Sequence, residues 1–235
     1  MRLDRYLSAL ELFSRRQSAF LIRKWFFQIN HQLITSRDYA LQEGDLISRE
    51  DQELIVKTHV TLLINKPTWY ISSDIDEYGR PSYKQLLVDY PYTPLLHIAG
   101  RLDVDTEGLI IASSDGQLVH KIISPKHHLP KHYLVTTRDP IDEMTCVRLA
   151  QGVVLDDGYH TLPAKVTILD SLHLELILIE GKYHQVKRML LAVGNEVVYL
   201  QRTAIGPRTI DGLVSGTYKE LSPHECVETL GITLS

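Results

Sequence analysis

The sequence predicts an α+β fold in two parts: a small N-terminal α+β module over residues 1–50 and a larger domain over residues 60–235. In the first part, helical spacing is followed by short strand patterns, which is typical of a compact α+β unit. In the second part, strand patterns outnumber helix patterns and do not alternate with them strictly. This favours a mixed or antiparallel sheet over a doubly wound one. Residues 51–59 are charge-rich and show no periodicity, so we expect a linker there.

Two helices and two short strands are expected in the N-terminal module. Apolar residues from Leu3 to Leu10 recur at helical spacing, and Ser14 is a suitable N-cap for a second helix. Strands are expected over residues 26–29 and 46–48, the second after a Glu-Gly-Asp turn.

The larger domain contains apolar runs of strand length and longer segments of helical spacing. Strands are expected over residues 60–65, 109–112, 133–137, 164–169, 172–179 and 197–200. Helices are expected over residues 82–88, 117–123, 141–151, 183–193 and 223–230.

The composition is that of a folded protein in a reducing compartment. Hydrophobic residues make up 44% of the chain and charged residues 23%. No apolar run approaches the roughly 18–20 residues that cross a membrane, and the N-terminus does not resemble a signal peptide. Cys146 and Cys226 form no disulfide or CxxC pattern, so we expect a cytoplasmic location.

Basic residues gather in three segments although the net charge is −4. Residues 1–24 carry six basic side chains against two acids, and residues 121–138 and 181–195 carry no acid. This clustering favours a focused surface for a polyanion, although each segment alone also fits an ordinary solvated face.

The segment from Gly100 to Leu109 is the densest in candidate chemistry, since it places three carboxylates, an arginine and a threonine between apolar runs. The pattern from Asp103 imitates a calcium-binding EF-hand loop, but the twelfth position, which needs a glutamate, is Ser114. Two interpretations of this segment remain open: a structural turn, and a catalytic carboxylate held by Arg101. The second would supply an ionised oxygen as nucleophile or base.

Two further segments could serve this site. Residues 124–135 carry His128 and His132, which suggest a metal, but no cysteine or third local ligand completes a zinc site. Tyr133 follows them and is either an ordinary strand tyrosine or a stacking surface for a base. In residues 180–190, basic residues near a helix start would attract phosphate or a carboxylate, or would simply be solvated.

Together, these segments resemble the RsuA family of pseudouridine synthases. Gly100-Arg101-Leu102-Asp103 is similar to the signature that carries the catalytic aspartate, and Lys131–Val135 to the motif whose tyrosine packs on the target base. Glu180–Met189 is similar to the motif whose basic residue pairs with that aspartate, and Asn65-Lys66-Pro67 to the opening strand motif. We expect Lys187 to be the basic residue that pairs with Asp103. Arg188 is the second candidate, because many relatives carry arginine where Lys187 stands.

The first 50 residues resemble an S4 RNA-binding module, with the helix after Ser14 as its RNA-facing helix. This part departs from the S4 pattern at two places. Lys24-Trp25-Phe26 and Asn30-His31 stand where relatives carry a glycine and an Asn-Gly turn. The pairing of the strands and the form of their turn are therefore open.

The resemblance implies that a uridine in ribosomal RNA, most closely the small-subunit 16S rRNA or its assembling particle, is isomerised to pseudouridine without metal or cofactor. The sequence carries no signal for oligomerisation, so we expect a monomer by default. Asp103 would attack C1′ or remove a ribose proton. Large-subunit rRNA as substrate, and a non-enzymatic S4-type ribosome-assembly protein, are the alternatives. The implied site residues are Asp103 for catalysis, Tyr133, Lys187, Arg188 and Arg101 for substrate binding, and Arg2, Arg15, Arg16, Arg23, Lys24 and Lys131 for RNA binding.

Overall fold

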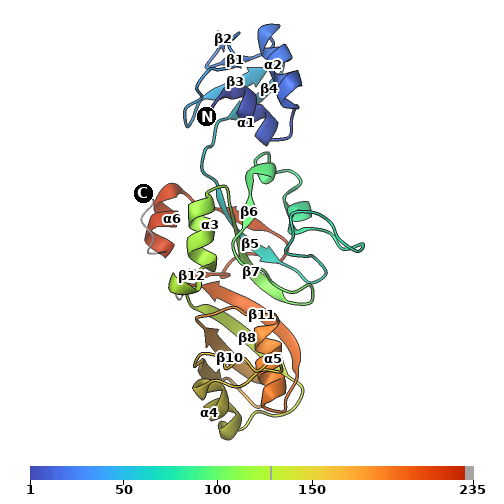
Figure 1. Cartoon of the computed structure of the whole chain (residues 1–235), viewed down its shortest axis with the longest axis vertical. Helices are drawn as coiled ribbons and strands as arrows, with labels where there is room; N and C mark the ends of the chain where they lie inside the picture. Colours follow the sequence, from blue (N-terminus) through green and yellow to red (C-terminus); the bar gives the residue numbers. More distant parts are fainter. Residues whose placement is uncertain (128, 231–235) are drawn as a thin grey trace.

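The computed structural model describes residues 1–127 and 129–230. Figure 1 shows the N-terminal module at one end of an elongated molecule and the larger domain beyond it, joined by a short stretch of chain. Within the described residues, no helix has the length and apolar character needed to cross a bilayer.

The N-terminal module packs two helices against an antiparallel sheet. The helices are α1 (Leu3–Ala9) and α2 (Arg15–Arg23), and Ser14 caps α2 through a capping box with Gln17, as its sequence predicts. The strand order is β2-β1-β3-β4. The strands are β1 (Gln28–Ile29), β2 (Gln32–Leu33), β3 (Leu46–Arg49) and β4 (Gln52–Ile55).

The turn between β1 and β2 has a left-handed backbone, which glycine usually supplies, although the turn contains no glycine. Asn30 and His31 have φ of 50° and 66° and join β1 to β2, and Trp25 after α2 has φ of 68°. Asparagine tolerates this region better than most residues, and the Asn30 side chain is fixed by donating to Asp45 and accepting from the Leu46 amide. β1 and β2 thus form an antiparallel hairpin with Asn30 and His31 in its turn.

The linker expected at residues 51–59 is corrected by the structure. Residues 52–55 form β4, which pairs with β3 along its full length, so that only residues 56–60 connect the two parts. β4 is an edge strand with largely exposed side chains, and a polar edge strand lacks the apolar alternation that identifies a half-buried strand in sequence.

The larger domain is built on a mixed sheet, as predicted. Its strand order is β13-β5-β7-β11-β8-β10-β9, with β6 beside β7 and β12 beside β11. Among the strand pairs of this sheet in the described residues, only β7–β11 is parallel. The strands are β5 (Thr61–Lys66), β6 (His97–Ile98), β7 (Glu107–Ser113), β8 (Lys131–Thr137), β9 (Lys165–Ile168), β10 (His173–Leu178), β11 (Val197–Ile205), β12 (Arg208–Thr209) and β13 (Tyr218–Glu220).

Helices lie near their predicted positions, with two differences. They are α3 (Gly116–Ile123), α4 (Glu143–Gln151), α5 (Gln185–Ala192) and α6 (Pro223–Leu230). The helix predicted at residues 82–88 is a 3₁₀ helix over Tyr83–Leu87, and further 3₁₀ turns cover Thr93–Leu95 and Pro125–His127. The helix predicted from residue 183 begins at Gln185, so Tyr183 and His184 precede it.

The centre of the sheet is buried on both faces. In β7, Ile110 belongs to the large core that continues into the N-terminal module, whereas Leu109 and Ile111 pack in a second core with residues of α3 and α6. Strands covered on both sides are difficult to displace, so β5 and β7 form a rigid base for the loops at their ends.

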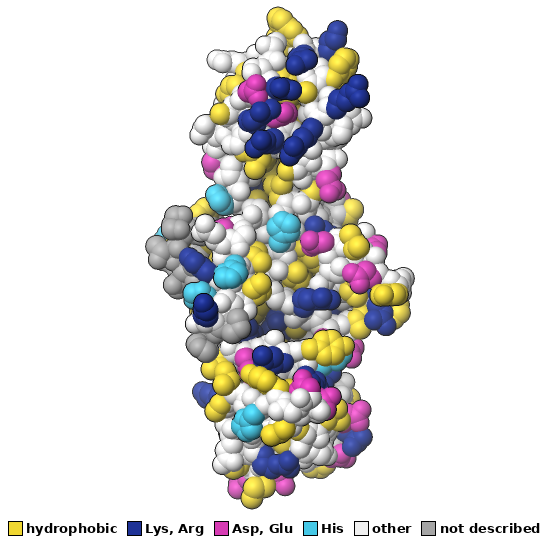
Figure 2. Space-filling model, viewed as in Figure 1, with side chains coloured by type: hydrophobic (Ala, Val, Ile, Leu, Met, Phe, Trp, Pro, Cys, Tyr) yellow, Lys and Arg dark blue, Asp and Glu magenta, His cyan; other side chains and the backbone are white. Residues whose placement is uncertain are grey.

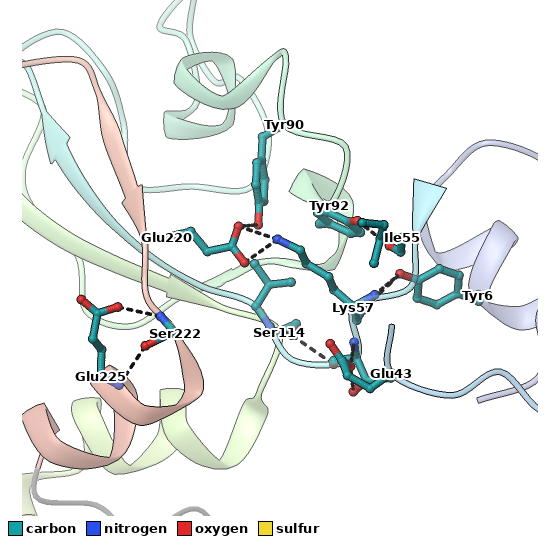
Figure 3. Close-up of polar contacts among 12 residues, drawn as sticks. Tyr6, Glu43, Ile55, Lys57, Tyr90, Tyr92, Ser114, Glu220, Ser222 and Glu225 are labelled. Atoms are coloured by element: carbon teal, nitrogen blue, oxygen red, sulfur yellow. Dashed lines mark hydrogen bonds and ion pairs between the residues drawn. The ribbon is translucent and has the colours of Figure 1, made fainter. Parts of the chain in front are cut away.

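A polar network joins the N-terminal module to the larger domain (Figure 3). The backbone amide and carbonyl of Lys57 bind the Tyr6 hydroxyl at 2.9 and 3.1 Å, and its ammonium lies 2.6 and 2.7 Å from the two carboxylate oxygens of Glu220 on β13. Tyr90 donates to the same carboxylate at 2.8 Å, and Tyr92 donates to the carbonyl of Ile55. Glu220 is thus the point at which the connecting segment is fastened to the sheet.

Replacing Glu220 with alanine should loosen this joint. The half-buried Lys57 ammonium and the Tyr90 hydroxyl would lose their shared partner, which should lower the free energy of unfolding by about 0.5–1.5 kcal/mol. We expect faster tryptic cleavage after Lys57 in Glu220→Ala than in the wild type. Glu196→Ala, which breaks an exposed pair with Arg138, serves as the control. Equal cleavage in wild type and Glu220→Ala would contradict a role for this contact in fastening the module.

Candidate active site

A cleft of about 830 Å³ crosses the larger domain beside the parallel β7–β11 junction. Its walls come from the loop before β7, the start of β8, and the segment that leads from β10 into α5. Figure 2 shows the hollow across the middle of this domain, with basic side chains at its edges. All three segments singled out in the sequence therefore meet in one place.

The loop over residues 100–106 is held in a defined shape from two sides. Ser72 is buried, and its hydroxyl binds both the amide and the carbonyl of Leu102 at 3.0 Å, while the Trp69 amide donates to Val104 at 2.7 Å. Gly108 follows at φ of 110° and packs so closely on β11 that a Cβ would lie 2.2 Å from the carbonyl oxygen of Arg202. Only glycine fits here, which fixes where the loop ends.

Asp103 lies at the centre of a small charged cluster in this cleft. Its carboxylate oxygens are 3.2 Å from Lys187 Nζ and 3.4 Å from His184 Nε2. Lys187 also contacts Asp105, at a shorter 2.6 Å, and therefore bridges the two aspartates of the loop. The Asp103 side chain keeps 26% of its surface exposed, so its oxygens remain accessible from the cleft.

The contact between Lys187 and Asp105 raises the pKa of the lysine and lowers the pKa of the aspartate, as expected for an ion pair. Burial raises the pKa of Asp105, but the hydrogen bond and charge of Lys187 outweigh it and hold that pKa below its usual value. Burial lowers the pKa of Lys187, but the hydrogen bond to Asp105 and the charge of Asp103 raise it above its ordinary range. Lys187 is therefore a permanent cation beside Asp103 at neutral pH.

The remaining cleft candidates occupy different positions. Tyr133 is 8% exposed and lies on β8 at the cleft wall, and Lys131 is in the same strand rather than in the basic loop expected before it. Arg101 is exposed at the edge of the cleft. Arg188 turns away from Asp103 and pairs instead with Asp156 and Asp157, the latter at 2.7 Å.

The N-terminal candidates lie outside the cleft. Arg15, Arg16, Arg23 and Lys24 are exposed on α2 and at its end, and Figure 2 shows basic side chains gathered over this module. Arg2 differs from them, since it pairs with Asp4 at 2.7 Å and with Asp38 at 2.8 Å.

Residues 60–192 match the family model described as RNA pseudouridylate synthase. The chain belongs to this pseudouridine synthase family. It is also 40% identical to the ribosomal small subunit pseudouridine synthase A of Haemophilus influenzae, over 96% of this chain and 97% of that protein. The protein of the same name from Pasteurella multocida is 38% identical over the same shares. A solved structure described as a pseudouridylate synthase superposes with a TM-score of 0.69, at 39% identity over 98% of this chain and 99% of that one.

Membership establishes that this synthase is an isomerase that acts on RNA. It does not by itself assign roles to single residues, so the roles expected for Asp103, Tyr133 and Lys187 remain predictions. Within the described residues, His, Cys, Asp and Glu side chains form no group of three or more that could hold a metal ion. His132 lies 3.2 Å from Glu175, and His128 lies outside the described residues.

Three residues of the synthase to which the sequence analysis assigned no role also shape the site. His184 touches Asp103, as described above. Arg202 is buried, and its guanidinium donates to the carbonyls of Leu109, Arg101 and Gly100 at 2.7, 3.3 and 3.5 Å. A charged residue inside a strand was the available signal for Arg202, whereas the left-handed backbone of His184, at φ of 49°, leaves no signature in sequence.

Lys66, the third of these residues, ends β5 and is fully buried. Its ammonium donates to the carbonyls of Pro67 and Tyr70, at 2.8 Å each. Burial lowers the pKa of Lys66 to about 8, although the carboxylates of residues 103–107 oppose this shift. Lys66 thus places a titratable cation beneath the acidic loop.

Lys66 should make the stability of the synthase depend on pH in the alkaline range. Its pKa is about 8 in the folded protein, against 10.5 for an ordinary lysine. Between these values the unfolded chain binds more protons than the folded one, so the contribution of Lys66 to the free energy of unfolding increases with pH. Lys66→Met lacks this contribution. The difference in unfolding free energy, wild type minus variant, should therefore rise between about pH 7.5 and pH 10 in urea denaturation.

Other titrating groups are common to wild type and variant, so they cancel in this difference. A difference that stays constant, or falls, over that range would show that Lys66 is not a buried lysine with a lowered pKa.

Proposed function

We propose that this synthase converts a specific uridine of small-subunit (16S) ribosomal RNA to pseudouridine, with Asp103 as the essential carboxylate. The observation that carries the proposal is the accessible Asp103 carboxylate held by Lys187 in a cleft that Tyr133 also lines. The name of the full-length relatives, ribosomal small subunit pseudouridine synthase A, supports the choice of RNA.

The reaction needs an anion at the sugar and no change in oxidation state. The bond from ribose C1′ to N1 of uracil breaks, the base turns, and C5 bonds to C1′, while C5 loses a proton and N1 gains one. Asp103 acts on the ribose, either as a nucleophile at C1′ or as a base that removes a ribose proton. We assign the pairing role to Lys187 rather than Arg188, because Arg188 is occupied by Asp156 and Asp157.

The uridine has to leave its stack to reach this carboxylate. Flipping a base out of a helix costs a few kcal/mol, and stacking on an aromatic ring returns about 1–3 kcal/mol. Tyr133 is nearly buried at the cleft wall, which suits a ring that covers one face of an enclosed uracil.

RNA outside the cleft would be held by the basic residues of the N-terminal module, which we take to be an S4-type RNA-binding domain. Arg15, Arg16, Arg23 and Lys24 present their charges to solvent, and Arg101 and Lys131 extend the basic surface into the cleft. Arg2 is partly neutralised by its two aspartates and is the weakest of these candidates. We place the enzyme in the cytoplasm, as a monomer.

Pseudouridine mapping of ribosomal RNA tests this proposal directly. We expect one new pseudouridine in 16S rRNA, or in its assembling particle, after incubation with wild-type protein, and none with Asp103→Asn. Asp105→Asn is the matched control, since Asp105 is in the same loop and shares Lys187 but is more exposed. It should retain most of the activity.

Modification by Asp103→Asn at the wild-type rate would remove Asp103 as the essential carboxylate. A new pseudouridine found only in large-subunit rRNA would show that this RNA, and not 16S rRNA, is the substrate. Tight RNA binding without modification of either RNA would favour a non-enzymatic role in ribosome assembly.

Replacing Arg15 and Arg16 together by glutamine should weaken RNA binding and its salt dependence. Each phosphate contact contributes about 0.7–0.9 to the slope of log K against log salt concentration. The double variant should therefore show a slope smaller by about 1.4–1.8 in a binding titration at several salt concentrations. Lys165→Gln, exposed on the edge strand β9 and outside the three basic segments, is the control. An unchanged slope in the double variant would mean that α2 does not hold RNA.

A further inference from the structure

Tyr183 is an exposed aromatic residue at the edge of the catalytic cleft. It keeps 76% of its surface accessible, and its ring is stacked on that of His184, with centroids 3.8 Å apart and planes 18° from parallel. One face of the Tyr183 ring is therefore covered by His184, while most of the side chain remains open to solvent. Neither the core of the domain nor the pairing of Asp103 with Lys187 requires this ring.

The loop that carries Tyr183 is fixed by buried polar groups. Glu180 is buried and accepts hydrogen bonds from the Leu162 amide, the Tyr159 hydroxyl and Gln185 Nε2, at 2.7–2.9 Å. Gln185 in turn accepts from the amide of Lys182 at 2.8 Å. Such a network leaves the loop little freedom, so the position of an exposed side chain on it is set in advance.

The backbone on either side of Tyr183 is also held. Arg188, which is anchored by Asp156 and Asp157, donates to the Tyr183 carbonyl at 3.2 Å. His184 has a left-handed backbone, which is unfavourable for a residue other than glycine and persists only where its surroundings impose it. Strained residues of this kind gather at functional sites.

The stack leads directly to the reactive carboxylate. His184 Nε2 lies 3.4 Å from Asp103 Oδ1, whereas the 3.2 Å contact of Lys187 is with Oδ2. Tyr183, His184 and Asp103 therefore form a continuous line of contacts from the edge of the cleft to its centre. An event on the outer face of Tyr183 can affect the orientation of Asp103 through one intervening ring.

From this geometry we propose that Tyr183 is a stacking platform for the RNA base next to the target uridine. The bound base, Tyr183 and His184 form a three-ring stack whose innermost ring contacts Asp103. His184 is then a positioning residue, which orients the carboxylate when the platform is occupied. This inference rests on the proposed function, since it requires an RNA whose uridine enters the cleft.

A neighbouring base fits Tyr183 better than the target uracil does. When a uridine flips out, the bases beside it lose a stacking partner and expose an aromatic face to water. Tyr183 offers a second aromatic face at the edge of the cleft, whereas Tyr133 is nearly buried at its wall. Every base has such a face, so the platform should accept any of the four bases.

The test compares Tyr183→Ala, Tyr183→Phe and wild type on the 16S rRNA fragment that mapping identifies. We expect kcat/KM to fall about 5- to 100-fold for Tyr183→Ala and to stay within about twofold for Tyr183→Phe, because stacking needs the ring and not the hydroxyl. Met144→Ala is the control: Met144 is 65% exposed, on α4, and does not line the cleft. Since Tyr183 is mostly solvated, its replacement should leave the unfolding curve unchanged.

A second measurement reports the stack itself. 2-Aminopurine placed beside the target uridine should lose fluorescence on binding wild type or Tyr183→Phe, and not on binding Tyr183→Ala. For the positioning role, His184→Ala should lower kcat more than it raises KM. Tyr183→Ala combined with His184→Ala should lose less than the product of the two single losses.

The outcomes separate this inference from the proposed function. If the wild type modifies no ribosomal RNA, the proposed function fails, and the platform that rests on it fails with it. If the wild type is active and Tyr183→Ala matches it in kcat/KM and in quenching, the platform is rejected while the proposed function stands. A Tyr183→Phe variant as impaired as Tyr183→Ala would also overturn the platform, because the hydroxyl would then be the essential group. Fully independent losses in the double variant would reject the link to Asp103.

Discussion

The buried guanidinium of Arg202 is the contact on which the geometry of the site depends. It lies on β11 opposite Gly108, where β7 and β11 run parallel, and it donates to carbonyls on both sides of the acidic loop. Within the described residues, no carboxylate is within ion-pair distance of it, so backbone carbonyls carry much of its solvation. A buried cation is unfavourable without such partners, and the loop is therefore held in the one arrangement that provides them.

The same arrangement explains why a loop rich in carboxylates can exist at the centre of the domain. Lys66 lies beneath the loop, Arg202 binds its backbone, and Lys187 bridges Asp103 and Asp105 from the other wall. Fixed charges that are in place before the substrate arrives do not have to reorganise during the reaction, which is the usual source of electrostatic catalysis. Asp103 thus keeps accessible oxygens while its neighbourhood balances its charge.

The sequence pointed to residues that the structure brings together in one cleft, but not to the contacts that orient them. Asp103, Tyr133 and Lys187 belong to recognisable motifs, and the mixed sheet followed from apolar runs of strand length. Whether Lys187 or Arg188 faces Asp103 depends on the rotation of α5, which begins two residues later than its periodicity suggested. β4 was missed because it is a polar edge strand. The roles of Lys66 and His184 depend on residues distant in the chain, and no local pattern encodes such contacts.

Under the proposed function, the two parts of the molecule divide the work of RNA binding. Exposed arginines on α2 can attract RNA of any sequence, since charge alone carries no base information. Selection of one uridine then has to come from the larger domain, where buried groups fix the shape of the cleft. The joint at Lys57 and Glu220 is consistent with this division, because a charge-assisted contact fastens the module to the strand β13, which pairs with β5 beside β7. Under the proposed function, RNA held by α2 would be presented to Asp103 from a direction set by this joint, and specificity would follow from the geometry between the two parts as well as from contacts inside the cleft.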